Sequence, residues 1–167
     1  MQPYNPAEEI VAIVDRENRP IGAVSRKIMR QQRLIHRASY ILVFNTAGEL
    51  FIQKRSRTKD IYPGYWDLAA GGVVLEGESY EESAKRELQE ELGLNGVKLR
   101  PLFDQYYEDA DNRVWGRIFA CTGNGPFTLQ EEEIDYGRFI RLGEIEQLNQ
   151  VEPVTPDGML LLRRLPH

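Results

Sequence analysis

Apolar residues recur at every fourth position between residues 79 and 93, the clearest regular pattern in the chain. On a helix this spacing places them on one face, which packs inward. Ser79 followed by Glu82 has the spacing of a capping box at a helix start, and Gly93 is the residue type that commonly ends a helix. The inward-facing residues are Ala84, Leu88 and Leu92. The pattern predicts a helix from Ser79 to Gly93.

Apolar runs on both sides of this helix predict strands. Residues 9–24 alternate as in a β-hairpin, with the turn at Glu17–Pro20. The runs Ala38–Phe44 and Leu50–Lys54 are apolar on both faces, which is typical of central strands. The other expected elements are a short helix over 26–33 whose basic residues are solvated, strands over 68–70, 97–107, 114–121 and 136–140, and helices over 142–148 and from 155 to before 166. Without a repeat or a linker, a single domain over residues 1–167 is expected.

Composition and charge narrow the functional classes. The formal net charge of -5 gives no general attraction to nucleic acid or to an anionic membrane. No apolar run reaches membrane-spanning length, and residues 1–10 lack the basic and apolar regions of a signal peptide. One cysteine excludes an internal disulfide, and two histidines beside it make no plausible zinc cluster. We therefore expect a cytoplasmic protein without a nucleic acid or a membrane as partner.

Three glutamates, Glu87, Glu90 and Glu91, share another face of the predicted helix. Their spacing of i, i+3 and i+4 brings the carboxylates together, and like charges so placed repel each other. The arrangement costs stability at neutral pH unless a cation neutralises it. Carboxylate oxygens suit a hard divalent cation such as Mg²⁺ or Mn²⁺. A solvated acidic face is the general alternative for a Glu-rich helix.

The positions around these glutamates match a known motif. Gly72, five residues, Glu78, seven residues and then the run RELQEELGL at 86–94 resemble the Nudix box at every constrained position. The chain is therefore similar to the Nudix hydrolases, and the motif covers residues 72–94. The resemblance implies a Mg²⁺-dependent enzyme, with Mn²⁺ as the other candidate metal, that cleaves a diphosphate linked to another group. It also implies an α/β fold of the family's α/β/α sandwich type, here with a mixed central sheet and an N-terminal β-hairpin.

The same resemblance implies roles for individual residues. The three glutamates would bind the metal together with the carbonyl oxygen of Gly72, and Arg86 would orient a catalytic glutamate. A bound divalent ion polarises the diphosphate and lowers the pKa of an attacking water. Nudix enzymes differ in where the general base lies. Glu87 or Glu90 within the box and the triplet Glu131–Glu133 outside it are therefore both open as the base.

A narrower resemblance covers the basic segment before the box. Arg55 and Lys59, followed by PGYW at 63–66, are similar to isopentenyl-diphosphate isomerase, in which the matching arginine and lysine bind the diphosphate of the substrate. Arg offers a bidentate fork and Lys a point charge for this purpose. The isomerase's catalytic cysteine corresponds to Gly71, and one of its metal-binding histidines corresponds to Val73. Without the cysteine its chemistry cannot run in the same way, so we expect Arg55 and Lys59 to bind a diphosphate for hydrolysis.

An aromatic residue beyond the box is a candidate for contacts next to the diphosphate. Strand alternation places Trp115 on the same face as Arg113 and Arg117, so this face is not fully apolar. Stacking of Trp115 on a nucleobase, worth about 1–3 kcal/mol per base, is one interpretation. Burial in the core is the other.

Three functions are open at this point. Hydrolysis of a nucleoside diphosphate linked to another group, or of a related small-molecule diphosphate, is the one we expect. Isomerisation of a small organic diphosphate is disfavoured by Gly71 and Val73, and a non-catalytic binding protein is disfavoured because no glutamate of the box is missing. The N-terminal hairpin is a candidate interface for a homodimer.

Overall fold

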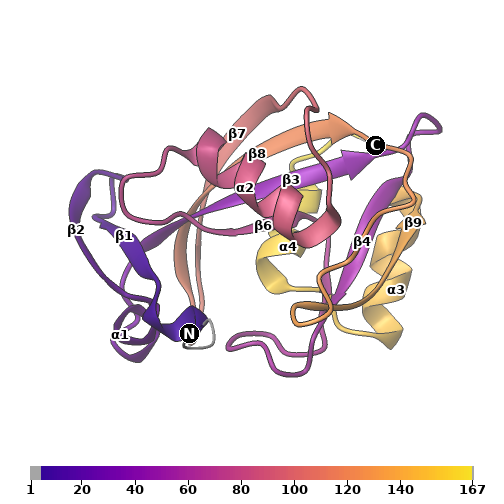
Figure 1. Ribbon diagram of the computed structural model, residues 1–167. Helices are drawn as coiled ribbons and strands as arrows, with labels where there is room; N and C mark the ends of the chain where they lie inside the picture. Colours follow the sequence, from indigo (N-terminus) through magenta and orange to yellow (C-terminus); the bar gives the residue numbers. More distant parts are fainter. Residues whose placement is uncertain (1–4, 167) are drawn as a thin grey trace.

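The computed structural model describes residues 5–166, with 3-10 helices marked η (Figure 1). In chain order its elements are η1 (Pro6–Glu8), β1 (Ile10–Val14), β2 (Pro20–Ser25), α1 (Arg26–Gln31), β3 (His36–Phe44), β4 (Leu50–Arg55), β5 (Trp66–Asp67), β6 (Ala70–Val73), α2 (Tyr80–Leu92), β7 (Arg100–Glu108), β8 (Arg113–Thr122), β9 (Ile134–Ile140), η2 (Leu142–Glu144), α3 (Ile145–Val151) and α4 (Pro156–Arg163).

A mixed sheet forms the middle layer, with α2 on one face and α3 and α4 on the other (Figure 1). Two clusters of buried residues fill the two interfaces. The cluster under α2 contains the three residues predicted to face inward, Ala84, Leu88 and Leu92. The other contains Ile145 of α3 and Leu161 of α4 together with Leu42 and Ile118 of the sheet. The predicted α/β/α sandwich with a mixed sheet is therefore confirmed.

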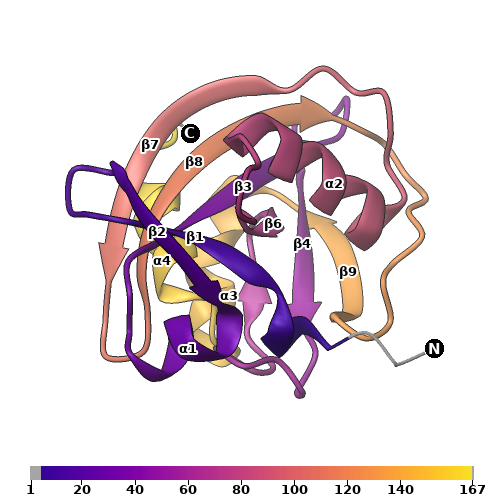
Figure 2. The same cartoon turned by 60° about the vertical axis from the view of Figure 1, so that its left-hand side comes forward.

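The strand β3 is the centre of the sheet. It pairs with β8 in parallel, from His36 opposite Val114 to Phe44 opposite Thr122, and with β1, β4 and β6 antiparallel. In turn β4 pairs with β5 and β9. The two runs predicted to be central strands from their apolar character are thus the best-connected strands. The predicted N-terminal hairpin of β1 and β2 joins the sheet through β1, and Figure 2 shows it on the same side of the molecule as α1.

The prediction of one strand over residues 68–70 is wrong. The chain instead forms two short strands, β5 and β6, with a bend at Leu68 and Ala69. Because β5 pairs with β4 whereas β6 pairs with β3, the backbone has to pass from one partner to the other between them. Leu68 is buried at this crossing and packs in the cluster on the α3 and α4 side. An apolar run indicates that residues are buried, but Leu68 is buried without pairing in a strand, so the run did not predict the strand boundaries.

The helix α2 has the caps that its sequence predicts. Ser79 accepts a hydrogen bond from the backbone N–H of Glu82, and the Glu82 side chain accepts one from the N–H of Ser79. Gly93 ends the helix with φ at 66°, a left-handed conformation that glycine adopts without steric cost. The caps fix where the three box glutamates lie along the sheet.

No helix within residues 5–166 has the length and apolar character needed to cross a membrane.

Candidate active site

A cavity of about 610 Å³ opens beside the last turns of α2. Its other walls are β6, the loop between β4 and β5, α1 with the segment before β1, and the segment before β9. Pockets of about 300–1,000 Å³ are the usual size for small-molecule sites. All six residues predicted to bind the metal or the diphosphate line it: Arg55, Lys59, Gly72, Glu87, Glu90 and Glu91. The structure therefore brings together residues that are up to 36 positions apart in the chain.

Arg86 connects the carboxylates of α2 to each other. Its Nη1 donates to Glu87 Oε1 at 2.9 Å and to Glu90 Oε2 at 3.3 Å. Its Nε and Nη2 form a bidentate pair with Glu78 at 2.7 and 3.0 Å, and Nη2 also contacts the carbonyl oxygen of Val73 at 3.3 Å. Bidentate pairs of this kind restrict the orientation of both side chains. Glu78 thus fixes Arg86, and Arg86 in turn holds two of the predicted metal ligands.

The other carboxylate pair in the cavity wall is Glu87 and Glu91. Burial raises the pKa of Glu87, although the Arg86 guanidinium opposes the shift. Burial also raises the pKa of Glu91 well above its ordinary value, and the neighbouring Glu87 carboxylate adds to the shift. The Glu91 carboxylate accepts a hydrogen bond from the Gly71 backbone N–H at 3.2 Å. It forms no ion pair within the described part of the chain, so its negative charge is poorly compensated.

The fit of these residues to a metal follows from that imbalance. Among residues 5–166, no three Asp, Glu, His or Cys side chains are gathered closely enough to chelate one ion. Arg86 draws Glu87 and Glu90 toward itself, and Glu91 is turned to the Gly71 N–H. Buried like-charged carboxylates of this kind are stabilised when a cation comes between them. The donor set therefore fits a hard divalent cation, which would have to draw the side chains together on binding.

The glycine pair of β6 serves two different purposes. A Cβ atom on Gly71 would lie 1.9 Å from the carbonyl oxygen of Ser39, and Gly71 has φ at +136°. A Cβ atom on Gly72 would lie 2.7 Å from Glu87 Oε1, which is the end of a flexible side chain. Gly71 is therefore required by the backbone of the sheet, whereas Gly72 makes room for a carboxylate of the site. The clash at position 71 also excludes a cysteine there without a change in the backbone.

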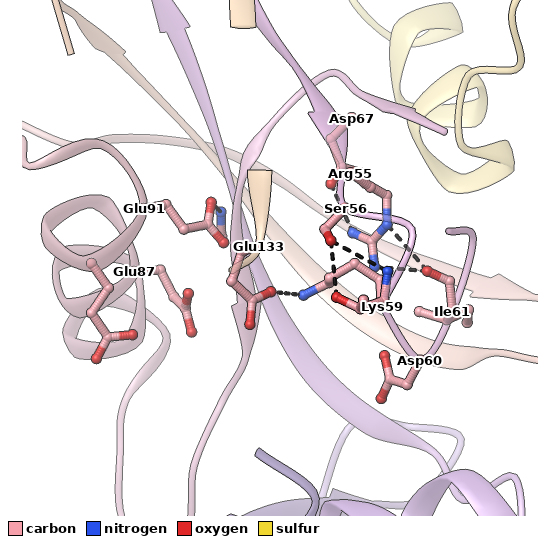
Figure 3. A network of polar contacts seen from close by, with 12 residues as sticks. Arg55, Ser56, Lys59, Asp60, Ile61, Asp67, Glu87, Glu91 and Glu133 are labelled. Carbon is pink, nitrogen blue, oxygen red and sulfur yellow. Dashed lines mark hydrogen bonds and ion pairs between the residues drawn. The ribbon is translucent and has the colours of Figure 1, made fainter. Parts of the chain in front are cut away.

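Arg55 and Lys59 line the cavity with their charges already paired (Figure 3). Arg55 Nη1 donates to Asp67 Oδ2 at 2.7 Å, and its Nε and Nη2 donate to the carbonyl oxygen of Ile61 at 3.2 and 2.9 Å. Lys59 forms an ion pair with Glu133. Lys59 also lies close enough to Glu87 and Glu91 to oppose the rise in their pKa. Both predicted phosphate-binding cations are thus in the cavity, on the side that faces the glutamates of α2.

The acidic triplet Glu131–Glu133 is divided by the structure. Glu132 and Glu133 line the cavity, whereas Glu131 does not. Figure 3 shows the Glu133 carboxylate turned toward Lys59, between the loop that carries Lys59 and the helix that carries Glu87. Glu133 is therefore the member of the triplet that pairs with a predicted phosphate-binding cation. The two alternatives for the base, within and outside the box, both lie in the same cavity.

Trp115 lies away from this cavity. It is not among the residues that line it. Its indole Nε1 donates to the carbonyl oxygen of Arg16 at 3.0 Å, and its ring packs on Tyr106 with 5.4 Å between centroids. Both partners belong to the N-terminal hairpin turn and β7, so the geometry gives no support to the base stacking predicted for Trp115.

The expectation that the basic residues of the helix over 26–33 are solvated is wrong for two of them. The side chains of Arg26 and Arg30 are only 14% and 18% exposed, and both line the cavity. Each forms an ion pair with Asp60, at 2.9 and 3.1 Å. The i, i+4 spacing predicts that the two arginines share one helix face. Their partner Asp60 lies 34 and 30 residues farther along the chain, so no local pattern indicates it.

A family model described as NUDIX domain matches residues 34–161. The chain belongs to the Nudix hydrolase family. An uncharacterised Nudix hydrolase of Pseudomonas aeruginosa is 44% identical over 155 residues, which cover 93% of this Nudix hydrolase and 92% of that protein. The uncharacterised Nudix hydrolase YfcD of Escherichia coli is 44% identical over 154 residues, which cover 92% of this chain and 84% of that protein. The crystal structure of DR0079 from Deinococcus radiodurans shares the fold, with a TM-score of 0.84 at 24% identity over 95% of this chain and 100% of that one.

Proposed function

We propose that this Nudix hydrolase cleaves the diphosphate bond of a small organic diphosphate, such as a nucleoside diphosphate linked to another group, with Mg²⁺ at the glutamates of α2. The observation that carries this proposal is the buried Glu91 carboxylate beside Glu87, which no cationic side chain of residues 5–166 pairs. A buried charge of this kind is costly until a cation compensates it. On the facing side of the cavity, Arg55 and Lys59 supply the complementary site for phosphate oxygens.

The residues of the chain divide the work between metal and phosphate. Glu87, Glu90 and Glu91, with the carbonyl oxygen of Gly72, would hold the divalent ion. When bound, such an ion polarises the diphosphate and lowers the pKa of a water ligand. Arg86 keeps the Glu87 and Glu90 side chains in place through its anchor on Glu78.

Arg55 and Lys59 would bind the diphosphate by exchanging partners. In the structure, Asp67 neutralises Arg55 and Glu133 neutralises Lys59. A diphosphate carries negative charge on both phosphates and, like a carboxylate, can accept a bidentate pair from an arginine, so it can take the place of both carboxylates at once. Release of Glu133 from Lys59 at this moment would leave a free carboxylate next to the bound substrate.

The test is a hydrolysis panel with and without divalent metal. Nucleoside triphosphates, dinucleotides, nucleotide sugars and coenzyme A are incubated with Mg²⁺, with Mn²⁺ or with EDTA, and products are followed by phosphorus NMR. We expect metal-dependent cleavage, reduced by about 100-fold or more in Glu91→Gln. Glu81→Gln is the matched control, since Glu81 lies exposed on the same helix and pairs with Lys85. Absence of cleavage of every compound with both metals, or equal activity of both variants, would contradict the proposal.

The general base is separated from the metal ligands by a second comparison. Glu90→Gln and Glu133→Gln are titrated with Mg²⁺ by calorimetry, and kcat is measured at saturating metal. A base that does not bind metal leaves the Mg²⁺ affinity unchanged and lowers kcat, whereas a metal ligand lowers both. A loss of kcat without a loss of affinity in only one of the two variants identifies the base.

A further inference from the structure

The cavity has a second group of cations on the wall formed by α1. Arg26 and Arg30 project from this helix and line the cavity together with Asp60 and Asn112. Arg26 donates to Asp60 through Nε at 2.9 Å and Nη2 at 3.3 Å. Arg30 donates to Asp60 through Nε at 3.1 Å and to Asn112 Oδ1 through Nη1 at 3.3 Å. In the described residues, Nη1 of Arg26 and Nη2 of Arg30 form no hydrogen bond, so each guanidinium keeps a free donor group.

The charges on this wall do not balance. The helix contributes Arg26, Lys27 and Arg30 to the lining. The carboxylates of Asp60, Glu9 and Glu133 act on Arg26, but Glu133 is already paired with Lys59, which leaves Asp60 and Glu9 for the three cations. Burial lowers the pKa of Arg30, and Arg26 and Arg55 add to the shift by repulsion, although Asp60 opposes it. Burial, Arg30 and Arg26 lower the pKa of His36, which also lines the cavity, to about 3, so its ring is neutral at pH 7. An anion on this wall would relieve the repulsion between buried cations.

The ion pairs of this wall are separate from those of Arg55 and Lys59, although Asp60 lies on the same loop as Lys59. Arg55 and Lys59 have their own partners, Asp67 and Glu133, and neither shares Asp60. A cavity of about 610 Å³ also has room for a substrate that extends beyond its diphosphate. The free donors on α1 line the same cavity as Arg55 and Lys59 and are available to a part of the substrate other than the diphosphate.

We propose that Arg26 and Arg30 form a second anion subsite, which binds a phosphate or carboxylate group on the part of the substrate remote from the scissile diphosphate. The preferred substrates are then organic diphosphates that carry an additional anionic group. This inference rests on the proposed function for its substrate class. The subsite itself, however, can be tested without turnover.

A purely structural role of the same contacts makes a different prediction. In that case Asp60 only ties α1 to the loop between β4 and β5, and removal of either partner has the same consequence. If the arginines bind an anion, Asp60 competes with it, and Asp60→Asn and Arg30→Gln act in opposite directions. Both variants remove the Arg30–Asp60 ion pair, and Asp60→Asn also removes the pair with Arg26, so a purely structural role predicts a loss in both variants that is larger in Asp60→Asn.

The first experiment titrates the metal-free protein with inorganic phosphate by calorimetry. We expect Asp60→Asn to bind phosphate more tightly and Arg30→Gln to bind it about tenfold or more weakly than the unmodified protein, the scale of a charged hydrogen bond. Arg117→Gln is the control, because Arg117 forms a bidentate pair with Asp104 and does not line the cavity. Equal or parallel changes in the two test variants, or no phosphate binding even in Asp60→Asn, would overturn the subsite. Phosphate held by Arg55 and Lys59 instead would leave Arg30→Gln unchanged.

The second experiment compares kcat/KM for substrates that differ only in a remote anion. Coenzyme A is paired with its 3'-dephospho form, which tests a phosphate, and UDP-glucuronate is paired with UDP-glucose, which tests a carboxylate. We expect the anionic member of at least one pair to be preferred, and the preference to fall about tenfold in Arg30→Gln and to rise in Asp60→Asn. Cleavage without any preference overturns the subsite alone. If none of the compounds is cleaved, the proposed function fails, and the phosphate titration still decides the subsite.

Discussion

The two adjacent glycines of β6 lead to the sharpest prediction, because substitution by alanine should lower stability at one position and activity at the other. Gly71→Ala places a methyl group 1.9 Å from the Ser39 carbonyl oxygen, at a backbone φ of +136°. Gly72→Ala places a methyl group 2.7 Å from Glu87 Oε1 and 2.9 Å from its Cδ, and its φ lies outside the left-handed range. The first obstacle is backbone in the central strand of the sheet, and the second is the end of a side chain that can rotate.

The magnitudes follow from these obstacles. For Gly71→Ala, backbone strain of about 1–3 kcal/mol and overpacking of about 1–3 kcal/mol add to roughly 2–6 kcal/mol, which corresponds to a fall in Tm of roughly 5–20 °C. For Gly72→Ala, displacement of Glu87 weakens its hydrogen bond with Arg86. The smaller entropy of the unfolded chain returns about 0.4–1 kcal/mol. We therefore expect Gly72→Ala to change stability by about 1 kcal/mol or less, and to lower kcat/KM by about 10–100-fold through the misplaced metal ligand.

Thermal unfolding and steady-state kinetics with Mg²⁺ measure the two effects. In a Glu87→Gln background, Gly72→Ala should add little to the loss of activity, since both changes act on the same side chain. Full activity of Gly72→Ala, or a fall in Tm as large as that of Gly71→Ala, would refute the division of roles. So would an additive loss in the double variant, because it would place the effect of Gly72 elsewhere than at Glu87.

Three further predictions concern single side chains of the site and its surroundings. The raised pKa of Glu91 means that the folded protein binds this proton more tightly than the unfolded chain, so the metal-free protein should lose stability as pH rises above about 4.3, the value of an unperturbed glutamate. Glu91→Gln should remove that part of the pH dependence and raise the metal-free Tm at pH 7, whereas added Mg²⁺ should stabilise only the unmodified protein; a parallel pH profile of both proteins in calorimetry would contradict this. Arg55→Ala should lower kcat/KM by an amount that corresponds to about 1.5–3 kcal/mol of lost transition-state stabilisation. A loss confined to Tm would instead show that Arg55 only stabilises the loop through its ion pair with Asp67. Trp115→Ala should lower Tm and leave the ratio of kcat/KM between nucleotide and non-nucleotide diphosphates unchanged, and a selective loss for nucleotides would restore the stacking hypothesis.

Features that depend on neighbours along the chain could be predicted from the sequence. The helix α2, its capping box and its Gly93 terminus were all placed correctly, because each depends on residues within about four positions. The common face of Glu87, Glu90 and Glu91 follows from the same helical spacing. The spacing of the box from Gly72 to Leu94 was also sufficient to recognise the family, which the match to the NUDIX domain model confirms.

Features that depend on partners far along the chain were decided by the tertiary structure alone. Arg26 and Arg30 line the cavity and not the solvated surface because they pair with Asp60, which is 30 or more positions away in the chain. The change of partner from β4 to β3 splits a short apolar run into two strands. Trp115 lies outside the cavity because its side chain contacts Tyr106 of β7 and the Arg16 carbonyl oxygen in the turn of the N-terminal hairpin. Spacing in a sequence determines which side chains share a face of one element, whereas the space around a face depends on which elements pack against it.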